Sequence, residues 1–272
     1  MQKLLIIKIG GNIIDDQEKL EKFLVNFASI DSKKILIHGG GKLATQVAEA
    51  MGIPQHMVEG RRITDRETLK VVTMVYAGYI NKNIVAGLQK HGCHALGLCG
   101  ADASAVRAHK RNSGSEHGKK GQDYGFAGDI DSINAEFFNN LLAQGVTPVM
   151  APITHDGQGQ LLNTNADTLA SEIAAALSRY YDTRLLFCFE KKGVLEFVED
   201  ENSVIPLITP SVYARLKADQ KLYEGMIPKI DNTFVAIRKG VGEVMIGHAD
   251  DLLANSSGQG KGTMITGEKN NG

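Results

Sequence analysis

Short apolar runs alternate along the chain with segments in which apolar residues recur every three or four positions. The runs are typical of buried strands and lie at residues 4–9, 35–37, 95–98, 146–151, 185–189 and 244–246. The periodic segments predict helices at residues 20–27, 43–51, 64–88, 134–142, 165–180, 210–217 and 230–239. Strands separated by helices over the whole length predict a mostly parallel sheet covered by helices on both faces.

Three segments add detail to this alternation. Residues 153–162 hold Asp156-Gly157 between two extended runs, which is typical of a hairpin. Thr64-Asp65-Arg66-Glu67 has the capping-box pattern, so we expect the long helix to begin there. Residues 108–122 are polar, basic and rich in glycine. We interpret them as a surface loop, because they lack the interleaved aromatic residues of a nucleic-acid site.

Composition excludes several classes of protein. The 272 residues carry 30 basic and 31 acidic side chains, a formal net charge of −1, and 43% are hydrophobic. This balance is ordinary for a globular protein and gives no broad attraction to nucleic acid or to anionic membranes. Cys93, Cys99 and Cys188 have no zinc or redox spacing, so we expect reduced core residues. With no signal peptide or bilayer-length apolar run, we expect a cytoplasmic protein.

Consecutive glycines follow two of the predicted strands. The first strand ends in Lys8-Ile9-Gly10-Gly11, and the second ends in His38-Gly39-Gly40-Gly41-Lys42. In open α/β sheets ligands bind at the carboxyl ends of the strands, where glycine amides can direct several N–H groups at one anion. Each turn also lies beside a lysine. The two turns together therefore favour a phosphate site over a pair of plain tight turns.

The second turn leaves a rival interpretation open. Residues 39–44 fit G-x-G-x-x-A after a strand, and Glu59 lies near the place of a ribose-binding acid. A dinucleotide-dependent oxidoreductase that uses the glycine turn at 38–44 is therefore an alternative. That motif leaves Lys8-Ile9-Gly10-Gly11 without a role, and the sequence contains no G-x-x-x-x-G-K-[ST] pattern of a P-loop.

Three further clusters combine charge with a helix start. Arg61-Arg62 could hold a carboxylate through paired N–H groups, and a solvated basic turn is an equal interpretation. Asp167 falls in the first turn of a predicted helix, where the helix dipole alone favours an acid. Lys229 falls in the first turn of another helix, where a cation is disfavoured unless an anion offsets it.

These stretches resemble the amino-acid kinase family, and within it most the N-acetylglutamate kinases. The matching segments occur in the family's order at residues 8–11, 38–41, 60–64, 123–128, 163–167, 225–229 and 262–263. The resemblance implies an α/β fold, an open αβα sandwich around a mostly parallel sheet, in two lobes. It implies that residues 1–175 form the N-terminal lobe that binds an acyl-glutamate. Residues 176–272 would form the C-terminal lobe that binds ATP, with one continuous sheet in a single domain.

The resemblance also implies roles for individual residues. Lys8 and Lys229 would contact the transferring phosphoryl group, and Asp167 would hold both lysines in place. The acylated amino acid would be bound, with its α-carboxylate on the arginine, by Gly40, Gly41, Arg62 and Asn163. Phosphate and nucleotide contacts would come from Gly10, Gly11, Glu190, Gly225 and Met226.

The implied reaction is the ATP-dependent phosphorylation of the γ-carboxylate of N-acetyl-L-glutamate, or of a related N-acyl-L-glutamate, in arginine biosynthesis. This carboxylate has a reference pKa of about 4.3 and is ionised at neutral pH, so no general base is needed. Two lysines, glycine amides and Mg²⁺ would neutralise the charge that accumulates as the carboxylate approaches ATP. Phosphates and water would hold the Mg²⁺, so we expect no metal-ligand cluster on the chain.

Other functions stay open on the same fold. Glutamate 5-kinase, aspartokinase and carbamate kinase are alternatives, because a fold does not fix a substrate. A non-catalytic ligand sensor is another alternative, against which the retained Lys8, Asp167 and Lys229 argue.

The sequence departs from the family pattern at several places. The nucleotide strand usually carries Ser/Thr-Asp, and here it reads Phe189-Glu190. The loop at 108–122 is longer than expected. Arg61 replaces an apolar residue, and a second cation there could serve a succinylated rather than an acetylated glutamate. The first strand begins almost at residue 1, without the N-terminal helix of arginine-inhibited relatives, so we expect a homodimer that arginine does not inhibit.

Overall fold

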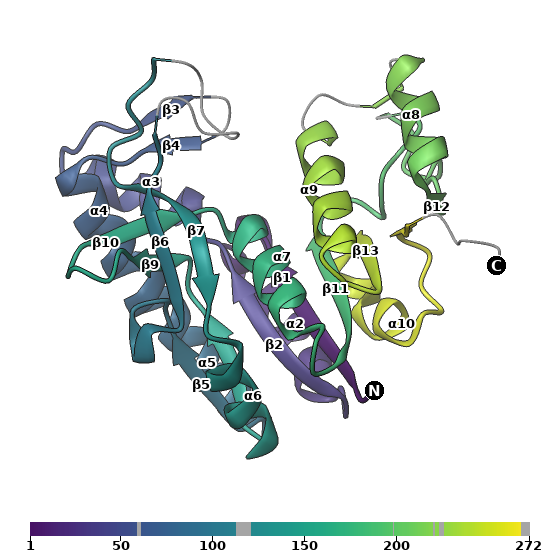
Figure 1. Ribbon diagram of the computed structural model, residues 1–272, viewed down its shortest axis with the longest axis horizontal. Helices are drawn as coiled ribbons and strands as arrows, with labels where there is room; N and C mark the ends of the chain where they lie inside the picture. Colours follow the sequence, from purple (N-terminus) through teal and green to yellow (C-terminus); the bar gives the residue numbers. More distant parts are fainter. Residues whose placement is uncertain (59–60, 113–120, 198, 220, 223–225, 268–272) are drawn as a thin grey trace.

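The fold is described from a computed structural model of residues 1–58, 61–112, 121–197, 199–219, 221–222 and 226–267. Within these residues the central sheet consists of β1 (Lys3–Ile9), β2 (Lys33–His38), β5 (Ala95–Leu98), β8 (Thr147–Met150), β11 (Asp182–Phe189), β12 (Leu207–Ile208), β13 (Glu243–His248) and β14 (Thr263–Ile265). The strand order is β12-β14-β13-β11-β1-β2-β8-β5 (Figure 1). All neighbours from β13 to β5 are parallel, and β14 runs antiparallel to β13. The predicted mostly parallel sheet is confirmed.

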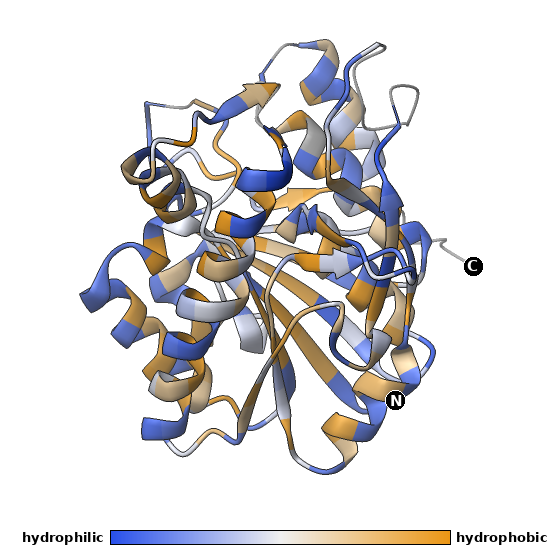
Figure 2. Cartoon of the chain, turned by 90° about the vertical axis from the view of Figure 1, so that its left-hand side faces the viewer, coloured by the Kyte–Doolittle hydropathy of each residue, from blue (hydrophilic) through white to orange (hydrophobic). Residues whose placement is uncertain are grey.

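Helices cover both faces of this sheet. One face packs against α2 (Gln17–Ala28), α3 (Gly41–Ala50), α5 (Asn81–Lys90) and α10 (Leu252–Ser257). The other packs against α6 (Ala135–Ala143), α7 (Ala166–Leu177), α8 (Pro210–Ala218) and α9 (Ile227–Arg238). In Figure 2 the central strands are largely hydrophobic, as a sheet buried on both faces requires. In the part of the chain that the structure describes, no helix has the length and apolar character needed to cross a membrane.

The helix predicted at residues 64–88 is a continuous helical run in three parts. It consists of α4 (Arg66–Thr73), the π-helical segment η1 (Met74–Ile80) and α5. The capping-box pattern located its start, but the cap is Asp65, whose carboxylate accepts a hydrogen bond from the Thr68 N–H at 2.7 Å. The Thr64 hydroxyl instead accepts a hydrogen bond from the Asn163 side-chain amide at 3.0 Å. The start of this helix is thereby joined to a segment 99 residues further along the chain.

A second, smaller sheet lies beside the central one. Its strands are β6 (Val106–Lys110), β7 (Ala127–Ile133), β9 (Ile153–His155) and β10 (Leu161–Thr164), which close into a small barrel. The hairpin predicted at 153–162 is confirmed as the antiparallel pair of β9 and β10. The predicted surface loop at 108–122 is wrong at its start, because residues 108–110 belong to β6, and residues 113–120 lie outside the described part. The hairpin of β3 (His56–Val58) and β4 (Arg61–Ile63) was not predicted.

The predicted boundary between lobes, at residues 175 and 176, falls near the end of α7. The central sheet continues across it, because β1 pairs with β2 on one side and with β11 on the other. The assignment of one ligand to each lobe stays a prediction.

A strained turn after β5 generates a test of stability. The exposed residue Ala103 has φ of 48° and ψ of 27°, a left-handed conformation that costs a residue with a Cβ atom about 1–2 kcal/mol. Glycine adopts it freely but loses more entropy on folding, about 0.5–1 kcal/mol. We therefore expect Ala103→Gly to raise the free energy of unfolding in urea by up to about 1 kcal/mol.

The neighbouring Ala101 provides the matched control, because its φ is −74°. Ala101→Gly should lower the free energy of unfolding by about 0.4–1 kcal/mol. If both variants lost stability equally, the turn at Ala103 would not be strained.

Candidate active site

The side chain of Lys8 reaches the carboxyl edge of the sheet through the alternation of β1. Leu4 and Ile6 pack into the core on the side of α7, and Lys8 follows them on the same face. Lys8 is only 7% exposed. Beyond it the strand ends at Gly10, and the short helix α1 (Gly11–Ile14) begins. The Gly39 N–H donates to Ile9 O at 3.1 Å, so the two glycine turns lie side by side.

Asp167 lies opposite Lys8 at the start of α7. Asn165 caps this helix, since its side-chain oxygen accepts hydrogen bonds from the Asp167 and Thr168 N–H groups, each at 2.9 Å. The cap directs the first turn at β1, and Lys8 Nζ lies 2.7 Å from Asp167 Oδ1. Burial works to raise the pKa of the Asp167 carboxyl, but the charges of Lys8 and Lys229 hold it below its ordinary value. Asp167 is therefore an anion at neutral pH.

Lys229 approaches the same place from α9. It lies in the first turn of that helix, and its ammonium is 3.9 Å from the centroid of the Phe189 ring at the end of β11. Lys8 Nζ is 5.3 Å from the same centroid. Burial lowers the pKa of Lys229, Asp167 raises it and Lys8 lowers it further. Two ammonium groups far apart in the sequence thus meet around one carboxylate and one aromatic ring.

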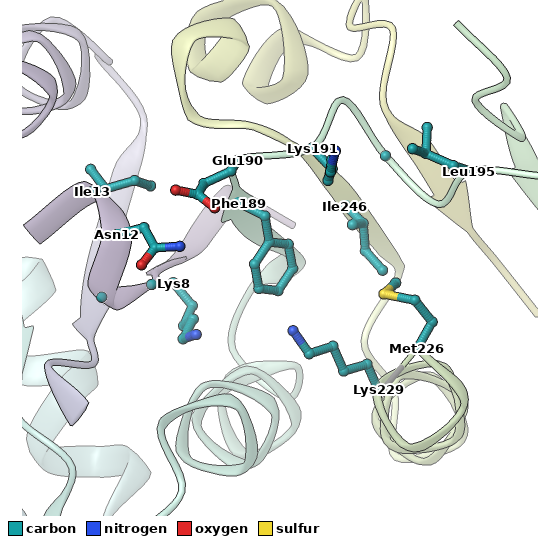
Figure 3. Close-up of a pocket in the computed structure, with 13 residues that line it drawn as sticks. Lys8, Asn12, Ile13, Phe189, Glu190, Lys191, Leu195, Met226, Lys229 and Ile246 are labelled. Atoms are coloured by element: carbon teal, nitrogen blue, oxygen red, sulfur yellow. The ribbon is translucent and has the colours of Figure 1, made fainter. Parts of the chain in front are cut away.

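A large cavity opens beside these charges. Its volume is about 610 Å³, and its lining includes Lys8, Gly10, Gly11, Phe189, Glu190, Met226 and Lys229. Figure 3 shows Lys8 and Lys229 on different elements at either side of the Phe189 ring, with the Lys229 ammonium pointing toward the ring and Glu190 next to Phe189. Glycine amides and two cations at one end of the cavity suit an anion with an extended apolar or aromatic remainder.

A second cavity of about 200 Å³ lies at the other glycine turn. Its lining includes Gly40, Gly41, Arg62, Tyr76, Arg111 and Asn163. Arg62 is oriented by Gly41 O at 2.9 Å and Thr45 Oγ1 at 2.8 Å, and also donates to the Gln55 side chain. Arg111 is paired with Asp129 at 2.5 Å. An arginine fixed by neutral acceptors keeps its full charge, so this cavity suits a small anion.

His38 supports the glycine turn at residues 39–41, which lines this second cavity. The His38 ring is fully buried, and its Nδ1 donates to Gly39 O at 2.9 Å. Its Nε2 accepts a hydrogen bond from the Asn81 amide at 3.1 Å. Burial lowers the pKa of His38 to about 4. With both ring nitrogens engaged and the ring buried, His38 supports the turn by packing.

The first turn of α7 connects the two cavities. Asn165 and Ala166 line the smaller one, while the next residue, Asp167, is paired with Lys8 of the larger one. Two anions, one bound in each cavity, would therefore meet at the Lys8–Asp167 pair. This arrangement suits the transfer of a charged group from one ligand to the other.

The sequence profile of the amino acid kinase family matches residues 3–248. The chain belongs to the amino acid kinase family. It is 54% identical to acetylglutamate kinase of Cytophaga hutchinsonii, over 93% of this chain and 94% of that one. Identity is 51% to acetylglutamate kinase of Phocaeicola vulgatus, over 97% and 98% of the two chains. It is 37% to acetylglutamate kinase of Methanopyrus kandleri, over 96% and 99%.

Solved structures share the amino acid kinase fold. A protein of Streptococcus mutans, smu.665, superimposes with a TM-score of 0.77 at 27% identity, over 97% of this chain and 98% of that one. N-acetylglutamate synthase from Neisseria gonorrhoeae, complexed with coenzyme A and N-acetyl-glutamate, gives 0.79 at 20% identity. That match covers 97% of this chain and 59% of the synthase. The expected open αβα sandwich is confirmed, and the family assignment favours a kinase over the dinucleotide-dependent alternative.

The structure distributes the predicted site residues between the two cavities. The residues predicted to contact the phosphoryl group and the nucleotide line the larger cavity, apart from Gly225: they are Lys8, Gly10, Gly11, Glu190, Met226 and Lys229. The residues predicted to bind the acylated amino acid line the smaller cavity: they are Gly40, Gly41, Arg62 and Asn163. Gly225 and Glu59 lie outside the described residues, as does the side chain of Arg61. The roles of these residues stay predictions, because placement alone does not test a role.

Sequence reasoning missed several residues that line the cavities. Tyr76 and Arg111 belong to the smaller cavity, and Asn12 and Lys191 to the larger one. Tyr76 is on the π-helical segment, whose changed spacing no periodicity in the sequence indicates. Arg111 falls in the segment that the sequence predicts to be a surface loop. Its pairing with Asp129 depends on the antiparallel register of β6 and β7, which no pattern in the sequence indicates.

The Lys8–Asp167 pair generates a prediction about stability in this amino acid kinase. Asp167→Asn leaves a buried ammonium without its carboxylate, so the free energy of unfolding at pH 7 should fall by about 3–5 kcal/mol. The difference in the free energy of unfolding between wild type and Asp167→Asn should shrink as the pH falls below about 3.8. A carboxyl with a depressed pKa contributes its full stability above its unfolded pKa and loses it as the pH falls through the folded one.

Glu172→Gln is the control on the same helix. Glu172 pairs with Lys239 at 2.5 Å, but the Lys239 side chain is 48% exposed, so its loss should cost less than about 1 kcal/mol. Urea unfolding of the three proteins between about pH 7 and pH 3 gives the comparison. A deficit in Asp167→Asn that stayed constant over this range would show that charge is not its cause.

Proposed function

We propose that this chain transfers the γ-phosphoryl group of ATP to the γ-carboxylate of N-acetyl-L-glutamate, or of a related N-acyl-L-glutamate such as the N-succinyl compound, and so acts in arginine biosynthesis. The acetylglutamate kinases that it resembles at 51–54% identity over more than nine-tenths of its length support this reaction. The observation that carries the proposal is the meeting of Lys8, Lys229 and Asp167 where two cavities adjoin, each of them lined by cationic side chains. A reaction between two anions needs this kind of site.

ATP would occupy the larger cavity, with its phosphates at the amides of Gly10 and Gly11. The acyl-glutamate would occupy the smaller cavity, with its α-carboxylate on Arg62 and its chain along Gly40 and Gly41. A γ-carboxylate oxygen then forms a bond to the γ-phosphorus as the bond to the β,γ-bridging oxygen breaks, which gives an acyl phosphate and ADP. Lys8 and Lys229 would stabilise the negative charge that spreads over the transferring oxygens.

ATP would enter this site as its Mg²⁺ complex. Among the described residues, no three acidic, histidine or cysteine side chains cluster so as to hold a metal ion. Asp167 is already paired with Lys8, and Glu190 lies on the rim of the larger cavity. This donor set suits an ion that arrives bound to phosphates and water, because Mg²⁺ gives up its waters reluctantly. The ion would neutralise part of the triphosphate charge.

The direct test is an assay for acyl phosphate, trapped with hydroxylamine, with ATP and N-acetyl-L-glutamate. Lys8→Ala and Lys229→Ala should each lower kcat about 10²–10³-fold, because each removes one preorganised donor from the transition state. Lys22→Ala is the control, since that lysine is on α2 with its side chain 58% exposed. Near-normal turnover in both site variants would overturn the assigned roles, and failure of the wild type on every acyl-glutamate would overturn the reaction.

The acyl group is a separate part of the proposal. Arg61 begins β4 next to Arg62, and a second guanidinium there would suit the extra carboxylate of N-succinyl-L-glutamate. Under this hypothesis kcat/KM for the succinyl substrate exceeds that for the acetyl substrate, and Arg61→Ala lowers the first by about 10-fold or more while leaving the second nearly unchanged. Steady-state kinetics with both substrates measure this. A strong acetyl preference in the wild type would remove the hypothesis.

We also propose a homodimer. Met74 and Tyr79 of η1 are 53% and 64% exposed, and Leu96 of β5 is 40% exposed. The helix that continues η1, α5, packs against β5. β5 is the last strand at its end of the central sheet. An apolar helix surface beside an edge strand favours association with a second copy.

A further inference from the structure

Phe189 lies between the two ammonium groups of the site. It occupies the place where the sequence departs from its family's Ser/Thr, at the last position of β11. Lys8 is in register with Phe187 across the parallel pair of β1 and β11, so Lys8, Phe187 and Phe189 share one face of the sheet. Figure 3 shows the Phe189 ring suspended between Lys8 and Lys229, with the Lys229 ammonium directed at it.

Lys229 is attracted by Asp167 but has no carboxylate in direct contact among the described residues. It is in the first turn of α9, where the positive end of the helix dipole disfavours a cation. Asp167 is engaged by Lys8 at 2.7 Å. Among the described residues, no carboxylate oxygen lies within 4.0 Å of Lys229 Nζ, whereas the centroid of the Phe189 ring lies 3.9 Å from it.

An aromatic ring holds a cation without cancelling its charge. The negative π face attracts an ammonium, and the attraction strengthens where water is excluded. A second carboxylate would also fix Lys229, but it would leave two cations and two anions with no net charge to offer a phosphoryl group. With Asp167 and Phe189 the cluster of Lys8, Lys229 and Asp167 keeps one net positive charge.

We propose that Phe189 is a positioning residue for phosphoryl transfer, whose ring face holds the Lys229 ammonium at the phosphate end of the larger cavity. The inference rests on the proposed function, because it assigns Lys229 to the transferring group. It adds a residue that acts through Lys229 and does not itself react. The charged groups that face Lys229 are Lys8 on β1, Asp167 on α7, and Glu190 and Lys191 beyond β11.

The test replaces Phe189 by 4-fluoro-, 3,5-difluoro- and 3,4,5-trifluorophenylalanine. Fluorine withdraws the negative charge of the π face and changes the shape of the ring little. We expect kcat to fall stepwise along the series, by about 3- to 30-fold in total, with KM for the acyl-glutamate unchanged. The kcat of Phe189→Leu should be equal to or lower than that of the trifluorinated variant. A role in packing alone would leave kcat independent of fluorination.

The matched control is the same fluorinated series at Phe187. Its ring stacks on Phe189 at a centroid distance of 6.1 Å, and no ammonium group of the described residues lies over its face. Fluorination there should leave kcat within about 2-fold of wild type. An equal fall at both positions would overturn the proposal.

A second measurement does not depend on turnover. Reductive methylation of Lys229, followed by mass spectrometry of its peptide, reports how firmly the ammonium is held and how readily it loses its proton. Methylation should become faster at each step of the Phe189 series and stay constant in the Phe187 series. A wild type without kinase activity but with this gradient would overturn the proposed function and keep the contact. If the fluorinated variants were active and neither kcat nor the methylation rate changed along the series, the proposed function would stand and the role of Phe189 would be overturned.

Discussion

Two ammonium groups and one carboxylate, removed from bulk water at the edge of a sheet, are the constraint around which this structure is arranged. Taking such charges out of water is costly unless they are paired, and one anion cannot fully satisfy two cations. Lys8 takes the direct contact with Asp167, and Lys229 is left with longer-range attraction and an aromatic ring. The residual positive charge is unfavourable in the protein without ligands. It would stabilise the negative charge of a phosphoryl group in the transition state of transfer.

The parallel sheet makes this convergence feasible. Lys8 ends a strand that pairs with β2 on one side and β11 on the other, so both glycine turns and Phe189 reach the same edge. α7 and α9 pack side by side on the same face and bring their first turns to that edge as well. Strand order and helix packing therefore gather residues from positions 8, 167, 189 and 229 into one place.

Much of this architecture is readable from periodicity, because each buried strand and each amphipathic helix carries its own pattern. The sequence also indicated Lys8, Asp167 and Lys229, since a resemblance to a family joins segments that no local pattern can connect. The contact of Phe189 with two lysines was not predictable. A phenylalanine at the end of an apolar strand is ordinary core, and only the placement of α9 turns its ring into a binding surface. Tyr76 escaped prediction as a cavity residue because an aromatic residue on an apolar helix face is also ordinary core.

The uncharged imidazole of His38 has a consequence for how the protein responds to acidity. Its two nitrogens are committed to Gly39 O and Asn81, and its pKa of about 4 keeps it neutral throughout the physiological range. The glycine turn that lines the smaller cavity is thus held by a group that does not titrate in that range, unlike an ordinary histidine. Acidification from pH 7 to about pH 5 would therefore leave the geometry of that loop intact.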